Sequence, residues 1–346
     1  MISHALSPVS RRRFLGLGAA GAAAALLTAC AGEGSGSEAA AGAAKTLNID
    51  FATYNPLSLV IKEKGWLEAT LKEQGVTVNW LQSAGSNKAN EALRADAIQV
   101  GSTAGSAALL ARANGSPIKV ISLYSQPEWS ALVVPKDSTI KSVAELKGKQ
   151  IAATKGTDPY FFLVQSLEEA GLSINDVTVQ NLQHADGRAA LDNGSVDAWA
   201  GLDPIMAGAE QAGATLLYRN LDFNTYGFLN ATEKFLNDSP ELAQTVVDAY
   251  EKARGWAAEN AEETAAILAD VASLDQAVAS QVILERSNLD VDGVPGEAQT
   301  KVLTTVGPIF VETGDVSDQA DIDDAVATIV DDTFAKKADA STIKDA

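Results

Sequence analysis

Side chains that commonly carry out covalent or metal chemistry are scarce in this sequence. Its 346 residues include two histidines, His4 and His184, and one cysteine, Cys30. A metal site needs several His, Cys or carboxylate ligands at close spacing, and none is visible. A Ser–His–Asp triad would need His184 as its base, but no GxSxG elbow is present, and there is no Walker A or GxGxxG loop. We therefore expect no enzyme, metal or cofactor, with His184 capping or lining a loop.

A second group of polar residues points to binding. Each lies at a turn between a predicted strand and a predicted helix, where free helix N–H groups favour an anion. Ligands of open α/β sheets bind beyond the carboxyl ends of the strands. Helix capping by the same residues is the alternative interpretation. The group comprises Asn55, Gly85, Ser86, Asn87, Ser102, Thr103, Thr157, Asp158, Asp186 and Asp203.

Neutral and acidic members of this group predict different partners. Asp158 and Asp203 would satisfy the N–H groups of their own helices and repel an anion, whereas the neutral residues leave helix dipoles free. We therefore expect an anionic head group against the first half of the fold. The acidic positions, together with Glu128, would hold an amine or bind through water. Aromatic residues in the same loops are expected to wall the cleft, namely Tyr54, Trp129 and Tyr160.

The elements that must position these residues alternate between strand and helix from Leu47 onward. This rhythm is typical of α/β domains with mostly parallel sheets, and it occurs in two successive sets. After Ser239 the pattern becomes helical to about Asp331, and the last residues read as a frayed tail. The predicted strands are 47–52, 76–81, 97–101, 118–124, 130–136, 149–154, 177–182, 196–201, 214–218 and a returning strand from 226.

The first residues read as an export signal rather than as part of the fold. Arg11, Arg12 and Arg13 precede a short Ala/Gly-rich apolar run, and "SRRRFLG" resembles a twin-arginine signal. "LTAC" resembles a lipoprotein processing site, which implies cleavage before Cys30 and a lipid anchor on its sulfur. A plain secretory signal is the alternative. We expect a signal peptide at 1–29 and a lipid-anchored flexible tether at 30–45.

Charge excludes one class of partner. The formal net charge is −19, with 26 Lys and Arg against 45 Asp and Glu, so there is no basic excess. Nucleic acid is therefore not an expected partner, because phosphate binding depends on clustered basic residues. Nothing in the sequence indicates a stable oligomer, so we expect a monomer.

Long stretches of the sequence resemble one family of transport proteins. They include "YNPLSLVIKEKGWLE", "AGSNKANEAL", "PKDSTIKSVAELKGKQIA" and "ADGRAALDNGSVDAWAGLDP". The chain resembles the solute-binding lipoproteins of ABC importers, in the branch that takes aliphatic sulfonates, taurine and nitrate. The resemblance implies an exported protein, lipid-anchored at the outer face of the cell membrane, that delivers a sulfonate-like molecule to a permease and its ATPase.

The resemblance also implies a fold and a set of boundaries. It is the type 2 periplasmic-binding-protein fold, with two α/β lobes hinged by crossover strands near Ser130–Lys136 and Thr225–Asn230. Lobe 1 would comprise 47–130 plus 225–335, lobe 2 would comprise 131–224, and 336–346 would be the tail. Leu202 stands where related sulfonate binders often have an aromatic residue, so taurine, nitrate and a thiamine precursor stay open as ligands. A desulfinase-like enzyme on this fold is the remote alternative.

Overall fold

The computed structural model describes residues 45–346, and these group as one compact unit. The predicted signal peptide and Cys30 lie outside the described residues. The first sheet has the strand order β2-β1-β3-β10-β4 and contains β1 (Thr46–Phe51), β2 (Thr77–Gln82), β3 (Val100–Ala104), β4 (Ile118–Ser125) and β10 (Gly227–Thr232). The second has the order β7-β6-β8-β5-β9 and contains β5 (Ser130–Val134), β6 (Gln150–Ala153), β7 (Thr178–Asn181), β8 (Ala198–Leu202) and β9 (Thr215–Tyr218).

Two strands carry the chain from one sheet to the other. β5 follows β4 in the sequence but pairs with β8 and β9, and β10 follows β9 but pairs with β3 and β4. Each is antiparallel to both of its neighbours, whereas the pairs formed by β1 with β2 and by β6 with β7 are parallel. The predicted α/β fold with two lobes and two crossover strands is confirmed.

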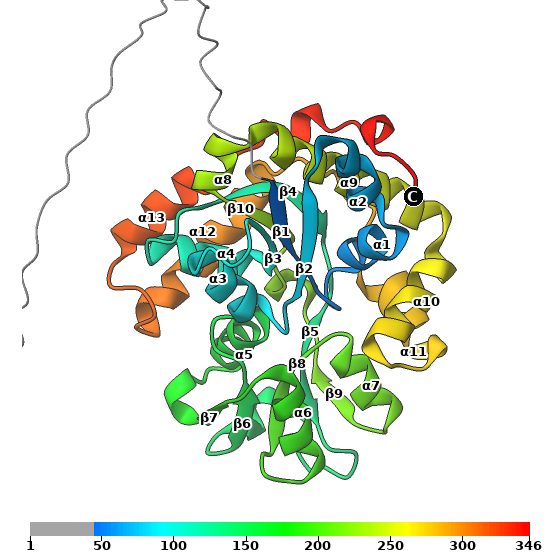
Figure 1. The fold of residues 1–346 in the computed structure, drawn as a ribbon. Helices are drawn as coiled ribbons and strands as arrows, with labels where there is room; N and C mark the ends of the chain where they lie inside the picture. Colours follow the sequence, from blue (N-terminus) through cyan, green and yellow to red (C-terminus); the bar gives the residue numbers. More distant parts are fainter. Residues whose placement is uncertain (1–44) are drawn as a thin grey trace, which may run out of the picture. The chain divides into compact units, whose positions relative to one another are not determined.

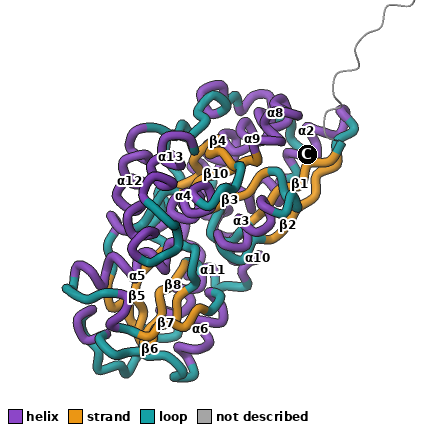
Figure 2. Tube along the Cα trace, turned by 90° about the vertical axis from the view of Figure 1, so that its left-hand side faces the viewer, coloured by secondary structure: helices purple, strands orange, loops and turns teal. Residues whose placement is uncertain are grey.

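Helices cover both sheets on two sides (Figures 1 and 2). Figure 1 shows α1, α2 and α9 on one side of the first sheet and α3, α4, α12 and α13 on the other. The helices are α1 (Pro56–Lys64), α2 (Trp66–Leu71), α3 (Ser86–Arg94), α4 (Gly105–Ala113), α5 (Asp158–Glu169), α6 (His184–Asp192), α7 (Ile205–Gln211), α8 (Glu233–Asp238), α9 (Pro240–Glu259), α10 (Ala261–Ala272), α11 (Gln276–Gln281), α12 (Glu297–Glu312) and α13 (Gln319–Thr328), with a π-helical turn at Val282–Arg286.

Apolar side chains join the two lobes at two places. At one, the rings of Phe161 on α5 and Phe310 on α12 lie 4.5 Å apart, centroid to centroid, in a buried cluster with Leu109 of α4. At the other, Ala207 of α7 packs with Leu59 of α1 and residues of α10 and α11. Because buried apolar surface favours association, both contacts hold the lobes together in this structure.

Two details differ from the sequence-based expectation. Ser102 and Thr103 were expected to begin a helix, but they lie inside β3, and α4 starts at Gly105. The C-terminal residues are not frayed: Ile343 is buried, the Lys344 N–H donates to Thr70 Oγ1 over 2.9 Å, and Thr342 Oγ1 donates to Asp248 over 3.0 Å. The end of the chain is therefore packed against α2 and α9.

A buried carboxyl group lies within the first sheet. Asp50 of β1 has no exposed surface and accepts hydrogen bonds from the Ser102 N–H and hydroxyl, at 2.9 and 3.1 Å. Burial disfavours the charged carboxylate and raises the pKa of Asp50 from 3.8 to about 7. The folded protein therefore holds this proton at pH values where the unfolded chain has lost it.

We expect Asp50→Asn to remove a pH dependence of stability. Since the folded pKa of Asp50 lies above the unfolded one, its contribution is fully present below about pH 4 and is lost as pH rises to about 7, by roughly 3–4 kcal/mol. The variant cannot titrate at this position. Urea unfolding of the wild type and the variant at pH 4.5 and 7 measures the difference between their free energies of unfolding. The same difference at both pH values would contradict the raised pKa of Asp50.

Candidate functional site

A cavity of about 290 Å3 lies between the ends of the two sheets. Its walls come from the loops after β1 and β2 in the first lobe and after β7 and β8 in the second, which are carboxyl ends of parallel strands. Val271 and Leu274 at the end of α10 complete the rim. The lining residues used below are Tyr54, Ser83, Gln183, His184, Leu202 and Asp203.

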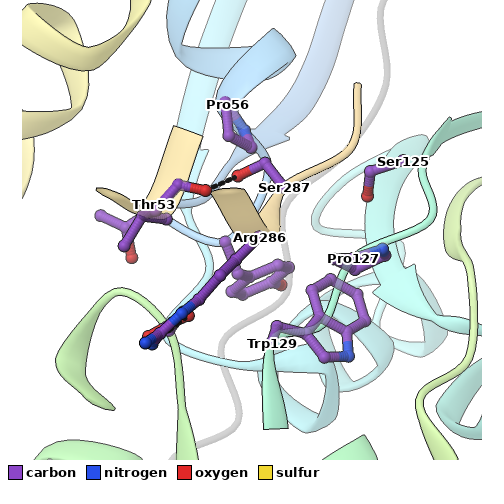
Figure 3. A pocket seen from close by; sticks show the side chains of 10 residues that line it. Thr53, Pro56, Ser125, Pro127, Trp129, Arg286 and Ser287 are labelled. Atoms are coloured by element: carbon purple, nitrogen blue, oxygen red, sulfur yellow. Dashed lines mark hydrogen bonds and ion pairs between the residues drawn. The ribbon is translucent and has the colours of Figure 1, made fainter. Parts of the chain in front are cut away.

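Of the aromatic side chains expected to wall the cleft, Tyr54 lines this cavity, and Trp129 packs against Tyr54 without being among the lining residues. The ring of Tyr54 meets the ring of Trp129 edge-on, with centroids 6.2 Å apart, and the Tyr54 hydroxyl donates to the Ser102 carbonyl over 3.0 Å. Both rings also line a smaller pocket of about 10 Å3, which is room for one water molecule. Figure 3 shows Trp129 and Pro127 on one side of this pocket and Thr53 and Arg286 on the other.

The carboxylate of Asp158, the first residue of α5, is the meeting point of three chain segments. It accepts hydrogen bonds from Trp129 Nε1, the Thr225 N–H and the Thr225 hydroxyl, each at 2.8 Å, and from the Ser106 hydroxyl of α4. Burial raises its pKa, and these donors oppose that shift. The expectation that Asp158 caps its own helix is wrong, because its oxygens are directed to other segments and the N-cap is Thr157.

A buried arginine that the sequence analysis missed pairs with Asp203. Arg286 Nη1 lies 3.3 Å from Asp203 Oδ2, and its Nη2 lies 2.6 Å from Glu210 Oε2. Asp203 also accepts from the Ala207 N–H of α7 over 2.9 Å, which confirms that it satisfies an amide of its own helix. Arg286 lies in the π-helical turn after α11, so this ion pair connects the C-terminal helices to lobe 2.

Helix starts around the cavity differ in whether they are capped. Asn55 accepts from the Ser58 N–H and donates to Tyr250, so it caps α1 rather than leaving its dipole free. α3 and α6 begin at Ser86 and His184 without a side-chain cap. The first N–H groups of a helix have no partner within it, so these two starts keep donors and a positive dipole end for an anion.

Several predicted residues are occupied by structural contacts or lie elsewhere. Thr103 accepts from Asn230 within the first sheet, and Ser102 serves Asp50. Glu128 forms a two-point ion pair with Arg219, at 2.9 and 2.6 Å, so it is not free to hold an amine. Tyr160 is buried against Phe161 instead of walling the cavity. Asp186 is exposed and is not among the residues that line these cavities.

Four side-chain atoms at or near the cavity are buried without a hydrogen-bond partner in the described part of the chain. His184 Nε2, Gln183 Oε1 and Ser83 Oγ belong to residues that line it, and Asn87 Oδ1 belongs to α3 of lobe 1, three residues after the lining residue Ala84. The two lobes meet here, because a Cβ added to Gly85 would lie 3.0 Å from His184 Nε2 and 2.8 Å from Asn87 Oδ1. Buried polar atoms are normally paired, so this region has unused hydrogen-bonding capacity.

Two further features bear on function. Among residues 45–346 there is no group of three or more His, Cys, Asp or Glu side chains that would hold a metal ion. No helix in the same range has the length and apolar character needed to span a membrane.

Sequence comparison establishes the family. Residues 56–264 match the model of the family described as NMT1/THI5 like, and the chain belongs to that family. It is 31% identical to the Bacillus subtilis protein named as aliphatic sulfonates-binding. The alignment spans 284 residues, which are 81% of this chain and 84% of the relative. It is also 32% identical to the taurine-binding periplasmic protein of Escherichia coli, over 42% of this chain and 45% of that one.

Solved structures share the fold. The alkanesulfonate-binding protein SsuA of Xanthomonas axonopodis pv. citri, bound to MOPS, superposes with a TM-score of 0.74 at 24% identity, over 82% of this chain and 98% of that one. The periplasmic aliphatic sulphonate binding protein SsuA of Escherichia coli gives a TM-score of 0.68 at 25% identity, over 81% and 91%. A desulfurization enzyme, DSZB, has the same fold, with a TM-score of 0.62 at 15% identity over 84% and 97%.

We expect Asp158→Leu to separate the lobes. The variant leaves Trp129 Nε1 and the Thr225 N–H buried without an acceptor, at about 1–3 kcal/mol each. Asp158→Asn keeps one oxygen that accepts from these two N–H groups. Its NH2 group takes the place of the other oxygen and donates to the hydroxyl oxygens of Ser106 and Thr225, so no buried group loses its partner. Small-angle scattering should show a larger radius of gyration for the leucine variant only.

The matched control is Asp186→Leu, because Asp186 is exposed. Its radius of gyration should equal that of the wild type. If Asp158→Leu changes neither the radius of gyration nor the free energy of unfolding, the Asp158 carboxylate does not hold the lobes together.

Proposed function

We propose that this member of the NMT1/THI5-like family is the solute-binding component of an ABC importer, which captures a sulfonate in the cavity between its lobes and releases it unchanged. The observation that carries the proposal is the cavity itself. It is bounded by strand ends from both lobes, and the uncapped start of α6 lines it. The uncapped start of α3 follows two residues after the lining residue Ala84, and polar atoms beside the cavity are buried without partners. The relatives named for binding sulfonates and taurine supply the ligand class.

A hinged mechanism follows from the connections between the sheets. The main chain passes between them through the segments that lead into β5 and β10, so a change of backbone angles there would move one lobe against the other. We assign 47–130 plus 225–335 to lobe 1 and 131–224 to lobe 2. In the open form the cavity admits the ligand, and closure restores the hydrogen bonds of Asp158 between lobes and crossover segments.

The proposed role of the charged groups is to close the protein, not to hold the ligand. Asp158 has four internal donors, and Asp203 has Arg286. The sulfonate is instead held by N–H groups at the starts of α3 and α6, since oriented backbone donors suit a dispersed negative charge. Neutral donors allow release, because no ion pair must be broken.

The described residues favour binding over catalysis. They contain no cysteine, because Cys30 is the only one in the sequence, and His184 is the one histidine among them. Burial lowers the pKa of His184 to about 4, so it is neutral near pH 7. A desulfurization enzyme shares the fold, but the proposed protein leaves the carbon–sulfur bond intact.

We expect short alkanesulfonates to stabilise the protein and change its tryptophan fluorescence, because Trp129 packs against Tyr54, which lines the cavity. A ligand at 100 times its Kd adds about 2.7 kcal/mol of stability, which raises Tm by roughly 5 °C for a chain of this size. Thermal shift measurements with ethanesulfonate, taurine, nitrate and a pyrimidine compare the ligand classes. A shift with nitrate or the pyrimidine alone would reject the sulfonate assignment, and release of sulfite would reject a binding role.

We also propose that the exported protein is anchored through a lipid on Cys30, with 1–29 as a twin-arginine signal peptide and 30–45 as a tether. The support is the sequence "SRRRFLG" followed by "LTAC". Cys30→Ser should move the protein from the detergent phase to the aqueous phase in Triton X-114 partitioning of cells. Replacing Arg11, Arg12 and Arg13 with lysine should retain it inside the cell. Partitioning that does not depend on Cys30 would contradict the anchor.

A further inference from the structure

The chemistry of the unpartnered atoms beside the cavity gives more than a ligand class. His184 is 2% exposed, lies at the start of α6 and lines the cavity. Its Nδ1 lies 3.2 Å from Thr154 Oγ1, and Thr154 Oγ1 lies 2.7 Å from the Leu182 carbonyl, to which it donates. The single hydroxyl proton of Thr154 is used by the shorter bond, so the histidine N–H must be on Nδ1.

This assignment determines what His184 offers the ligand. A neutral imidazole with its proton on Nδ1 has a lone pair on Nε2, which is an acceptor. The lowered pKa of His184, about 4, is consistent with that neutral form. No described group donates to Nε2. The atom is therefore a buried acceptor that lacks a donor, next to Gly85 and on a residue that lines the cavity.

Two carboxamide oxygens are in the same state. One is Oε1 of Gln183, the residue immediately before His184. The other is Oδ1 of Asn87, which belongs to α3 of the opposite lobe. Asn87 Oδ1 and His184 Nε2 converge on the α-carbon of Gly85, where a Cβ would contact both. A left-handed backbone at Gly85, with φ of 141°, also favours glycine. Three acceptors beside one cavity thus lack a donor, and the Ser83 hydroxyl, whose oxygen is also buried without a partner, is the fourth polar group there.

We propose that His184, Gln183 and Asn87 form an acceptor site for a hydrogen-bond donor carried by the ligand. This rests on the proposed function and deepens it: the preferred ligand is a short sulfonate with an ammonium or hydroxyl group, not a plain alkanesulfonate. The acceptors are side chains of the same two helix starts, those of α3 and α6, whose main-chain N–H groups face the sulfonate, so only a short molecule carries both groups to them. An ammonium group supplies three donors, which matches the number of acceptors.

Three ligands of nearly equal size test the acceptor site. Taurine carries an ammonium group, isethionate carries a hydroxyl group, and propane-1-sulfonate carries a methyl group at the same position. Isothermal titration of the wild-type protein should give about tenfold tighter binding for taurine or isethionate than for propane-1-sulfonate, since one hydrogen bond to a buried acceptor is worth up to about tenfold. The ratio between taurine and isethionate identifies the donor.

Variants assign this preference to His184. His184→Leu should weaken binding of the donor-bearing sulfonate about tenfold and leave propane-1-sulfonate within twofold. His184→Gln presents an oxygen acceptor and should recover part of the preference. Ala189→Ser, an exposed and uncharged position further along the same helix, is the matched control and should leave all three affinities unchanged. If His184→Leu does not fold, Asn87→Leu replaces it with the same expected loss.

The possible failures are distinguishable. Equal affinities of the wild type for all three sulfonates would overturn the acceptor site and leave the proposed function standing. Loss of all three ligands to the same extent in His184→Leu would also overturn it, because it would show that His184 donates to the sulfonate. Failure of every sulfonate to bind the wild type would overturn both proposals.

Discussion

The buried carboxylate of Asp158 is the interaction on which the arrangement of the two lobes depends. One helix of lobe 2 presents it, and its donors come from α4 of lobe 1 and from the two segments that lead into the crossover strands. A carboxylate in this position is costly to desolvate unless each oxygen is well paired. All of these hydrogen bonds form only when both lobes and both crossing segments are in the positions seen here. The hydrogen bonds of this one residue therefore depend on the arrangement of the whole interface.

The fold was largely predictable, because hydrophobic periodicity and polar–proline helix starts are local signals. The predicted crossover at Ser130–Lys136 agrees with β5, and the one at Thr225–Asn230 agrees with β10. The errors arise where local signals compete. "VGSTAG" offers small polar residues suited either to a strand end or to a helix cap, and the β-sheet pairing with β10 decides for the strand. The tail looked frayed because its contacts with Thr70 and Asp248 are distant in sequence.

The candidate site was less predictable, since its residues act through tertiary contacts. Tyr54, which lines the cavity, and Trp129, which packs against it, stand out in the sequence because they are aromatic side chains in predicted loops. Arg286 gave no signal, because a charged residue in a helical segment is ordinarily solvent-exposed, and only the fold brings it to Asp203. Asp158 looked like a cap, since aspartate before proline commonly is one. The lone pair of His184 depends on which bond the Thr154 hydroxyl makes, which no sequence pattern encodes.

The position of β10 has a consequence for how the polypeptide is made. This strand sits between β3 and β4, and residues 126–226, including the whole of the second sheet, are synthesised before it. A nascent chain that ends before Gly227 can complete the second sheet, but its first sheet has a gap, with the inner edges of β3 and β4 unpaired. Open strand edges promote aggregation, so chaperone engagement should be strongest while the ribosome translates this interval.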